Sequence, residues 1–481
     1  MRKVAKKVLK GPDMNGKLLL GAVLVIVLLG GCTLAPKYTR PAAPVPAAWS
    51  AGTPQAGTVP AASAPPAELP WQEFFTDERL QKIIGIALGN NRDLRLAALN
   101  VERARALYGI QRAELLPTVN AAGIMSKERV PADLSSTGSA RTSERYDVKL
   151  GVSSWELDFF GRIRSLKDQA LETYLASDQA RRSAQILLVS TVANTYLTLA
   201  ADREALKLVT STLEAQEASY KMIRKRHDVG LSSELDLRRA QSQVDSARGD
   251  VARYTQLAAQ DENALNLLVG SPLPASLLPA ELASVSPPRE IAPGLSSDVL
   301  LQRPDVLAAE HQLKAANANI GAARAAFFPR IALTTTVGTA SADLSGLFKS
   351  GQGTWSFVPS ITIPIFDART WSAYDVTKVD REISVAQYEK AIQTAFREVA
   401  DALAVRDTVS RQIAAQQSLV EAVAETYRLS NARYTKGIDS YLGVLDAQRS
   451  LYGAQQGLIS LHLAGLANRV TLYNVLGGGQ R

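Results

Sequence analysis

Four segments of the chain alternate between apolar and polar residues, the period-two pattern of strands with one apolar face. The clearest is 146–152, and the others are 331–338, 355–365 and, more weakly, 115–125. The hairpins that contain these segments, at about 115–160 and 327–366, are long enough for two tilted strands each to cross a bilayer. A half-buried sheet in water gives the same alternation, so the pattern alone does not distinguish a membrane sheet from a soluble one.

Helical patterns of unusual length follow each pair of strands, at 163–229 and 370–436, with no Pro and few Gly. At 1.5 Å per residue each predicts a rod of about 100 Å, longer than a single globular core. Gly230 and Gly437 are expected to cap these helices in the left-handed conformation, after which a second helix runs back.

Both returning helices carry an apolar stripe with 3,4 spacing, as in a coiled coil. The helix near the C-terminus has a second stripe beside the first, so it can pack on two neighbours, which predicts a sheet or tube of helices. The first stripe is Leu237, Ala240, Val244, Ala247, Val251, Tyr254 and Ala258, matched by Val444, Ala447, Leu451, Ala454, Leu458, Leu461 and Gly465; the second is Ile459, Leu463, Leu466, Val470 and Tyr473.

The chain is a tandem repeat, with halves at 76–285 and 286–481. For each half we predict a helix, then a β-hairpin (about 115–160 and 327–366), then a helical hairpin (about 163–269 and 370–476). The offset between matching residues falls from 212 to 207, and we place the extra residues of the first half in a loop at about 131–144. At offset 212, Asp93, Gly109 and Pro117 match Asp305, Gly321 and Pro329; at offset 207, Arg226, Gly230 and Leu235 match Arg433, Gly437 and Leu442.

The first 31 residues predict a secretory signal: six basic residues and then an apolar run at 18–29, too short to span a bilayer. The sequence Leu-Gly-Gly-Cys at 29–32 resembles a bacterial lipobox, in which the chain is cut before the cysteine. Cys32 would then carry a covalent lipid. The alternative is a plain signal peptide with an incidental cysteine.

Cys32 is the only cysteine, so no disulfide can form within the chain. Thr33, rather than Asp, follows it, which by the sorting rule of such lipoproteins suggests the outer membrane. Whether Met1 or Met14 is the true start stays open. From 32 to 75 the chain is rich in Pro, Ala, Ser, Gly and Thr, so we expect an extended, lipid-anchored strap.

Charge and motifs exclude several classes of function. The net charge of +8 falls to +3 without the first 31 residues, and no RNA-binding motif or zinc-finger spacing occurs, so we expect no nucleic-acid partner. The sequence has no phosphate-binding glycine loop, no GxSxG elbow and no Cys or His cluster. We therefore expect no enzyme, no metal and no cofactor other than the lipid on Cys32.

Four membrane strands are too few to close a barrel. An open sheet edge in lipid costs several kcal/mol for each unpaired backbone group, so the chain must associate. Two, three or four copies could each close a barrel, so physical grounds alone do not give the number of copies.

The motifs resemble those of TolC/OprM-like outer membrane factors, the NodT-type lipoproteins of RND efflux systems. The resemblance covers nearly the whole chain after Cys32 and rests on LQRPDV at 301–306, RYTKG at 433–437, DSYL at 439–442 and LDAQR at 445–449. It implies a mixed α and transmembrane β fold, a trimeric duct. Four strands per protomer would form a 12-stranded barrel in the outer membrane, and twelve helices would form a periplasmic tube.

The same resemblance implies passive export of drugs or other small solutes. The expected partners are two further copies of the chain, a periplasmic membrane-fusion adaptor, an inner-membrane RND-type pump and outer membrane lipid. The cargo, the identity of the pump and adaptor, and the lumen charge are not given by the sequence.

The resemblance places a periplasmic gate at Leu442, Asp446 and Arg449. Leu442 and Asp446 are four residues apart and share a helix face. In a trimer, three Leu442 would form an apolar plug and three Asp446 an acidic ring that favours cations. The alternative is an ordinary surface pair of Asp446 and Arg449. Arg239 and Ser242 stand at the matching positions of the first repeat, so opening should depend on the second helical hairpin.

Two turns are predicted by the same resemblance to dock the adaptor. They are also good helix–helix turns, with Gly for the cap and Ser or Asp to start the next helix, and both roles can hold together. The residues are Val229, Gly230, Leu231 and Ser232 in the first turn, and Lys436, Gly437, Ile438 and Asp439 in the second.

Two rival functions remain. A lipid-anchored coiled-coil spacer of the envelope would need no pore, but it would have no reason to carry amphipathic hairpins beside each long helix. A lipoprotein enzyme acting on peptidoglycan would need convergent carboxylates or a nucleophile in a globular cleft, and the sequence shows no such domain.

Overall fold

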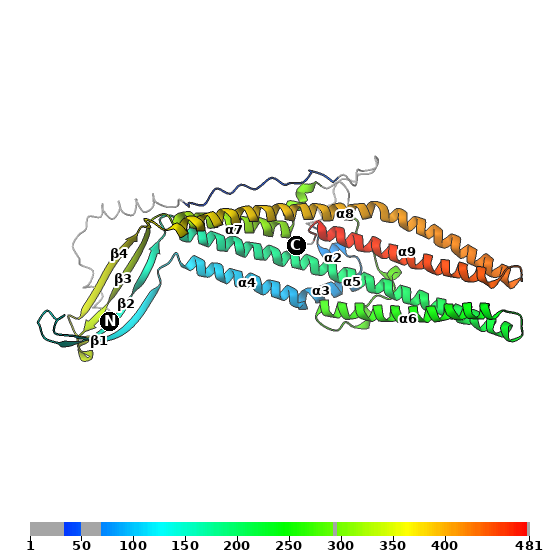
Figure 1. Ribbon diagram of the computed structural model, residues 1–481, viewed down its shortest axis with the longest axis horizontal. Helices are drawn as coiled ribbons and strands as arrows, with labels where there is room; N and C mark the ends of the chain where they lie inside the picture. The colour runs from blue at the N-terminus through cyan, green and yellow to red at the C-terminus, as the bar shows by residue number, and fades with distance from the viewer. Residues whose placement is uncertain (1–32, 50–68, 292–295, 479–481) are drawn as a thin grey trace. The chain divides into compact units, whose positions relative to one another are not determined.

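The computed structural model describes residues 33–49, 69–291 and 296–478 (Figure 1). The predicted signal and Cys32 lie outside the described residues. The chain divides into two compact units, and each contains parts of both repeats. One holds Arg103–Tyr174 and His311–Val385 with the start of the strap, and the other holds Ala42–Glu102, Leu175–Glu310 and Ala386–Arg481. The repeats are therefore not separate domains.

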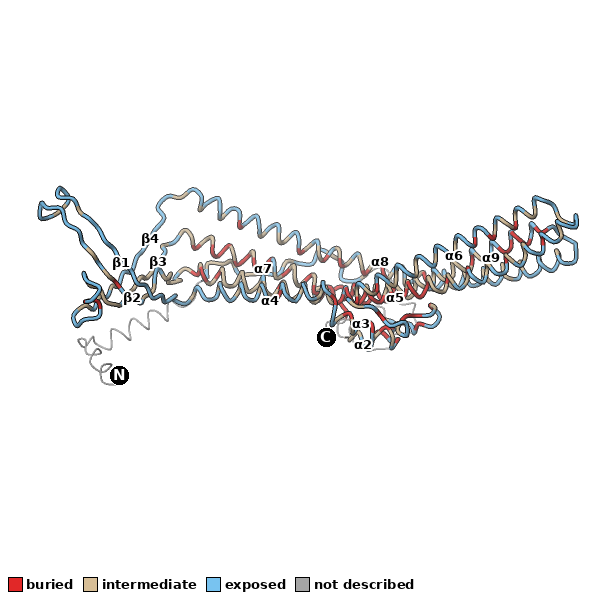
Figure 2. Tube along the Cα trace, turned by 90° about the horizontal axis from the view of Figure 1, so that it is seen from below, coloured by how far each residue is buried: buried red, intermediate tan, exposed pale blue. Residues whose placement is uncertain are grey.

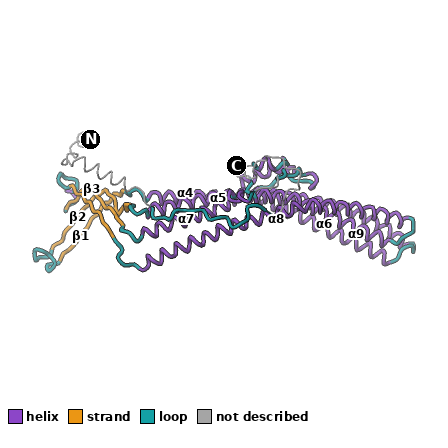
Figure 3. The backbone as a smooth tube through the Cα atoms, turned by 90° about the horizontal axis from the view of Figure 1, so that it is seen from above, coloured by secondary structure: helices purple, strands orange, loops and turns teal. Residues whose placement is uncertain are grey.

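The first unit contains one antiparallel sheet of four strands in chain order, β1 (Val119–Val130), β2 (Arg141–Leu157), β3 (Arg330–Ser341) and β4 (Gly353–Thr362) (Figure 3). All four predicted strands are confirmed. Because the order is β1-β2-β3-β4, β1 and β4 are the edges, and each leaves one row of backbone groups unpaired in the protomer.

The strand register separates an apolar from a polar face. Residues paired across strands point to the same side, and neighbours along a strand point to opposite sides. The apolar face carries Val119, Met125, Val148, Leu150, Val337, Trp355 and Phe357, and the polar face carries Asn120, Ser126, Asp147, Lys149, Thr336 and Ser356. The apolar side chains are exposed in the protomer: Trp355 is 77% exposed and Phe357 59%. This face needs a covering that the residues described by the structure do not supply.

A bulge in β2 keeps the apolar face continuous. The pairing with β3 shifts between Val152 and Trp155, and Ser154 has a positive φ of 55°. Trp155 thereby lies opposite Leu333 and joins the apolar face, where an unbulged strand would have turned it to the polar face.

The extra residues of the first repeat lie in β2 and not in the 131–144 loop, so that prediction was wrong. The loops at 131–140 and 342–352 are nearly equal in length, whereas β2 has 17 residues and β4 has 10. As a central strand, β2 is long because its two neighbours overlap it at opposite ends: β1 pairs with Arg141–Val152 and β3 with Tyr146–Leu157. The edge strand β4 pairs with β3 alone, over Gly353–Thr362.

Two long helical hairpins confirm the predicted helices. They are α5 (Arg162–Asp228) with α6 (Glu234–Val269), and α8 (Ala368–Thr435) with α9 (Tyr441–Val475) (Figure 1). Shorter helices, α4 (Arg92–Ala113) and α7 (Pro304–Ala325), precede the two pairs of strands. Both predicted apolar stripes are buried or half-buried along their whole length (Figure 2). Part of α5 is long and apolar enough to cross a membrane, but 61% of that stretch is buried inside the protein, as expected of a packed helix.

The core of the second unit surrounds the middle of α5. The second stripe of α9 packs here, as do α2 (Trp71–Phe74) and α3 (Glu78–Asn90). Phe74 stacks on Tyr473 with ring centroids 4.0 Å apart. The strap therefore ends before residue 75, because Phe74 and Phe75 are buried core residues. Four short 3-10 helices complete the described structure, at Ala275–Leu277, Leu282–Ser284, Ser297–Gln302 and Leu344–Gly346.

Candidate functional site

The two helix turns predicted to dock a partner have the same geometry. Gly230 (φ 73°) and Gly437 (φ 74°) adopt the left-handed conformation that favours glycine. In the first turn Gly230 N donates to His227 O at 2.8 Å and the next amide donates to Arg226 O at 2.7 Å; the second turn repeats this pattern. These are Schellman caps, which satisfy the last carbonyls of α5 and α8.

A groove of about 520 Å³ lies between the two turns. It brings together five of the predicted docking residues, whereas Val229, Lys436 and Ile438 do not line it. The predicted lining residues are Gly230, Leu231, Ser232, Gly437 and Asp439, and the structure adds Arg226, Ser233, Asp236, Tyr434, Ser440 and Tyr441. Of the added residues only Ser233 and Ser440 match each other by the repeat, and that match was a signal that could have found these two.

An apolar cluster beneath the groove holds the two hairpins together. Ile223 of α5 and Ala240 of α6 are buried against Tyr441, Val444 and Leu445 of α9. At the groove, the Arg226 guanidinium lies 5.2 Å from the ring centroid of Tyr434. In the second turn Arg433 pairs with Asp439, which lowers the pKa of that carboxyl. The two turns thus form one surface.

The predicted gate residues share one exposed face of α9. Leu442, Asp446 and Arg449 are all exposed, while the opposite face is buried. Arg449 Nη2 donates to Asp446 Oδ1 at 2.8 Å, and the two side chains are 69% and 55% exposed. In the protomer, then, these residues form the surface pair of the alternative interpretation. Their role as a gate stays a prediction.

The first described residues of the strap, 33–36, lie in a slot formed by α5 and α7. Thr33 lies 3.3 Å from Ser165, measured between hydroxyl oxygens, Asn317 Nδ2 donates to Pro36 O at 2.7 Å, and Arg324 Nη1 donates to Leu34 O at 3.1 Å. A Cβ on Gly321 would lie 2.7 Å from the backbone nitrogen of Ala35, so this position requires glycine. Ser165 follows β2 closely in sequence, so the strap begins near the foot of the sheet.

Arg303, from the LQRPDV motif, joins three helices in the second unit. It is 8% exposed, and its guanidinium binds both oxygens of Asp305 at 3.0 and 2.7 Å, Glu398 Oε2 at 2.9 Å and Val475 O at 2.6 Å. Burial opposes the charge, but the hydrogen bonds with Asp305 and Glu398 outweigh it and raise the pKa of Arg303. The motif is therefore a structural clamp.

Two carboxyl groups, Asp202 of α5 and Asp261 of α6, face each other inside the first helical hairpin. Burial raises the pKa of both groups, and the charge of Asp202 helps to raise the pKa of Asp261 to about 6. Arg253 partly offsets the shift at Asp202, but its guanidinium also contacts Asp250 and the Tyr254 ring. Above pH 6 the pair therefore carries repelling charges.

We expect Asp261→Asn to stabilise the hairpin near neutral pH. A carboxyl with a raised pKa in the folded state destabilises that state when it ionises, so the penalty grows between about pH 4 and 6 and is constant above. After allowance for solvent screening the gain is about 1 kcal/mol. Thermal unfolding midpoints at pH 4 and pH 8 measure it. The gain should appear at pH 8 only, and the exposed Asp245→Asn on the same helix should give none.

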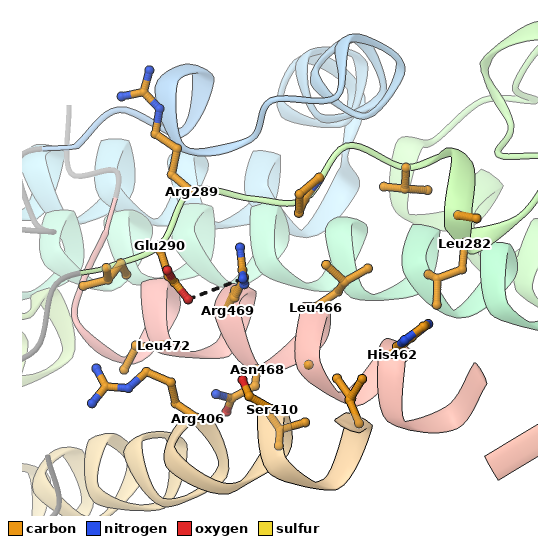
Figure 4. A pocket seen from close by; sticks show the side chains of 17 residues that line it. Leu282, Arg289, Glu290, Arg406, Ser410, His462, Leu466, Asn468, Arg469 and Leu472 are labelled. Carbon is orange, nitrogen blue, oxygen red and sulfur yellow. Dashed lines mark hydrogen bonds and ion pairs between the residues drawn. The ribbon is translucent and has the colours of Figure 1, made fainter. Parts of the chain in front are cut away.

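A mainly apolar cavity of about 310 Å³ lies between residues 282–291, α8 and α9 (Figure 4). Its polar groups bind neighbouring protein groups: Arg469 donates to Pro288 O at 3.0 Å and pairs with Glu290 at 3.4 Å, and Asn468 Nδ2 donates to Ala402 O at 3.0 Å. The two interactions of Arg469 attach the 282–291 segment to α9, and the Asn468 bond joins α9 to α8. Within the described residues, no three His, Cys, Asp or Glu side chains gather to hold a metal ion.

The family model for outer membrane efflux proteins matches residues 83–271 and 295–478. The chain belongs to this family. Its relatives include the probable efflux pump outer membrane protein TtgC of Pseudomonas putida, 50% identical over 96% of both chains, and the outer membrane protein OprJ of Pseudomonas aeruginosa, 42% identical over 95% of both. Among solved structures, the open-state MtrE channel of Neisseria gonorrhoeae is 40% identical, with a TM-score of 0.84 over 94% of this chain and 99% of that one.

Membership in the efflux protein family shows in which compartment the sheet and the helices lie. The chain is the outer membrane component of an efflux system, with its sheet in the outer membrane and its helical tube in the periplasm. The apolar face of the sheet is accordingly the face toward lipid.

Proposed function

We propose that three copies of this chain form a duct that passively conducts drugs or other small solutes across the outer membrane and catalyses no reaction. The observation that carries the proposal is the sheet, which has an exposed apolar face and two unpaired edges, β1 and β4. Lipid does not tolerate such edges, and edge-to-edge pairing of three copies gives a closed barrel of 12 strands.

Exposed apolar side chains beside both edges support association between copies. In the first unit, α4 and α8 carry apolar residues that no described part of the protomer covers. They include Leu107, Ile110, Trp371, Val376, Val379 and Ile383, each 49–65% exposed. The non-conducting spacer would leave these surfaces and the amphipathic sheet without a role. Planar-bilayer recording of the purified protein separates the two functions, since the duct conducts ions and the spacer does not.

In the proposed assembly, a periplasmic adaptor docks on the groove between the two turns and receives solutes from an inner-membrane RND-type pump. Supporting this, five of the eight predicted docking residues line the groove, and the caps and the Ile223 cluster hold the two turns in place. The lipid on Cys32 would anchor the strap where Thr33 meets Ser165.

Gly437→Leu should weaken adaptor binding while leaving the trimer intact. A Cβ at Gly437 meets no atom within 4 Å, so the fold loses only about 1–2 kcal/mol from the left-handed backbone, whereas the bulky side chain enters the docking groove. Adaptor pull-down and gel filtration measure the two effects. The control is Gly249→Leu on α6, where space is also open. If Gly437→Leu reduces trimer formation as much as adaptor binding, Gly437 serves only to form the helix–helix turn and the docking role is not supported.

Asp446→Ala should increase the closed-state current and reduce cation preference, because the proposed acidic ring would lose its carboxylates. Removal of the surface pair itself costs only a few tenths of a kcal/mol, so folding should not change. Single-channel conductance and reversal potentials check this against Asp245→Ala, an exposed carboxylate on α6. If the closed current and the selectivity do not change, Asp446 and Arg449 are an ordinary surface pair and the gate prediction is wrong.

A further inference from the structure

The end of α5 carries a basic face of three exposed side chains. Lys221, Arg224 and Lys225 are exposed, and their spacing of three and four residues puts them on one side of the helix. None of the three forms an ion pair with any residue that the structure describes. The opposite side of the helix holds Ile223 in the buried cluster, so these cations contribute nothing to packing.

The second hairpin has no such face. At the matching positions, Arg428 donates to both oxygens of Glu425 at 2.7 and 2.6 Å, and Asn431 and Ala432 replace the other two cations. Like charges four residues apart destabilise an isolated helix. The helix dipole compensates only the cations of the last turn, which include Lys225 but not Lys221 or Arg224. An acidic partner would neutralise the rest of this basic face.

We propose that this face binds an acidic surface of the periplasmic adaptor, so that the adaptor recognises the first hairpin by charge and the groove by shape. The inference rests on the proposed docking function of the turns. Arg226, directly after Lys225, lines the groove, so one partner can contact both surfaces. Three exposed cations on one helix face attract an acidic surface over several ångströms and make its binding dependent on salt.

The test uses the detergent-solubilised full-length trimer and, as probe, the soluble adaptor of the Pseudomonas putida toluene efflux pump. Dissociation constants are measured at 50 and 500 mM salt. We expect Lys221→Gln/Arg224→Gln/Lys225→Gln to weaken binding about tenfold at low salt and to remove most of its salt dependence. Lys390→Gln/Arg397→Gln, which removes exposed cations of α8 away from the turns, should leave binding unchanged.

The outcomes separate the two proposals. If Gly437→Leu weakens binding and the triple variant does not, the basic face has no part in docking and this inference fails alone. If the wild-type trimer binds no adaptor at either salt concentration, the docking function fails and the inference with it. If the triple variant dissociates the trimer, the face contacts a second copy of the chain, which overturns the inference.

Discussion

Gly338→Ala should abolish assembly of the protein in the outer membrane. A Cβ at this position would lie 2.1 Å from Val148 O and 2.8 Å from Lys149 Cα, both backbone atoms of the neighbouring strand. Neither atom can yield without separating β2 from β3, the central pair of the sheet. We expect a loss of about 3 kcal/mol or more and few or no SDS-resistant oligomers in membrane fractions.

Gly123→Ala is the matched control for the effect at Gly338. Gly123 lies in β1 directly opposite Val148, at the same level of the sheet, and a Cβ there meets no atom within 4 Å. It should assemble like the wild type. If both variants assemble and melt alike, the close approach of β2 and β3 is not a property of the folded sheet.

Arg303→Leu should lower the free energy of unfolding by about 2–4 kcal/mol. The change removes four hydrogen bonds from a guanidinium that is 8% exposed and leaves Val475 O without its donor. Arg303→Lys should recover only part of the loss, because an ammonium cannot match the forked geometry of the guanidinium. The denaturation midpoint of the purified protein measures both.

Arg369→Leu is the matched control for Arg303. Arg369 also pairs with an aspartate two residues away, Asp367, but its side chain is 92% exposed. Such an exposed pair contributes little to stability. Similar midpoints for Arg303→Leu and Arg369→Leu would show that Arg303 does not clamp the helices.

Much of the fold could be predicted from the sequence, because local patterns encode it. The long helices lack Pro, and both returning helices keep their stripes, so their ends were placed within about two residues. The position of the extra residues was missed because the shift lies in a strand. A bulge such as that at Ser154 preserves the alternation on each side, so the pattern gives no sign of the insertion.

The site was predicted less completely, because contacts between distant segments have no local signal. The glycines at the helix ends predict the turns, but only the folded structure shows that one groove joins them. The sequence does not predict that Asp202 and Asp261 lie close together, because each occupies an ordinary polar position of an amphipathic helix. The strap slot at Gly321 was hidden for a similar reason: the repeat matches it to Gly109, where a Cβ would meet no atom within 4 Å.

Closure of the barrel between copies is tested most directly by cysteine cross-linking of the two sheet edges. Cys32 is the only native cysteine and is expected to be lipidated, so a pair formed by Ser126→Cys in β1 and Thr354→Cys, Ser356→Cys or Val358→Cys in β4 reports on these edges alone. We predict that at least one pair gives disulfide-linked dimers and trimers in membranes, and that single variants give none. Absence of intermolecular cross-links for every pair, with the protein present as monomers that do not conduct, would contradict the proposed duct.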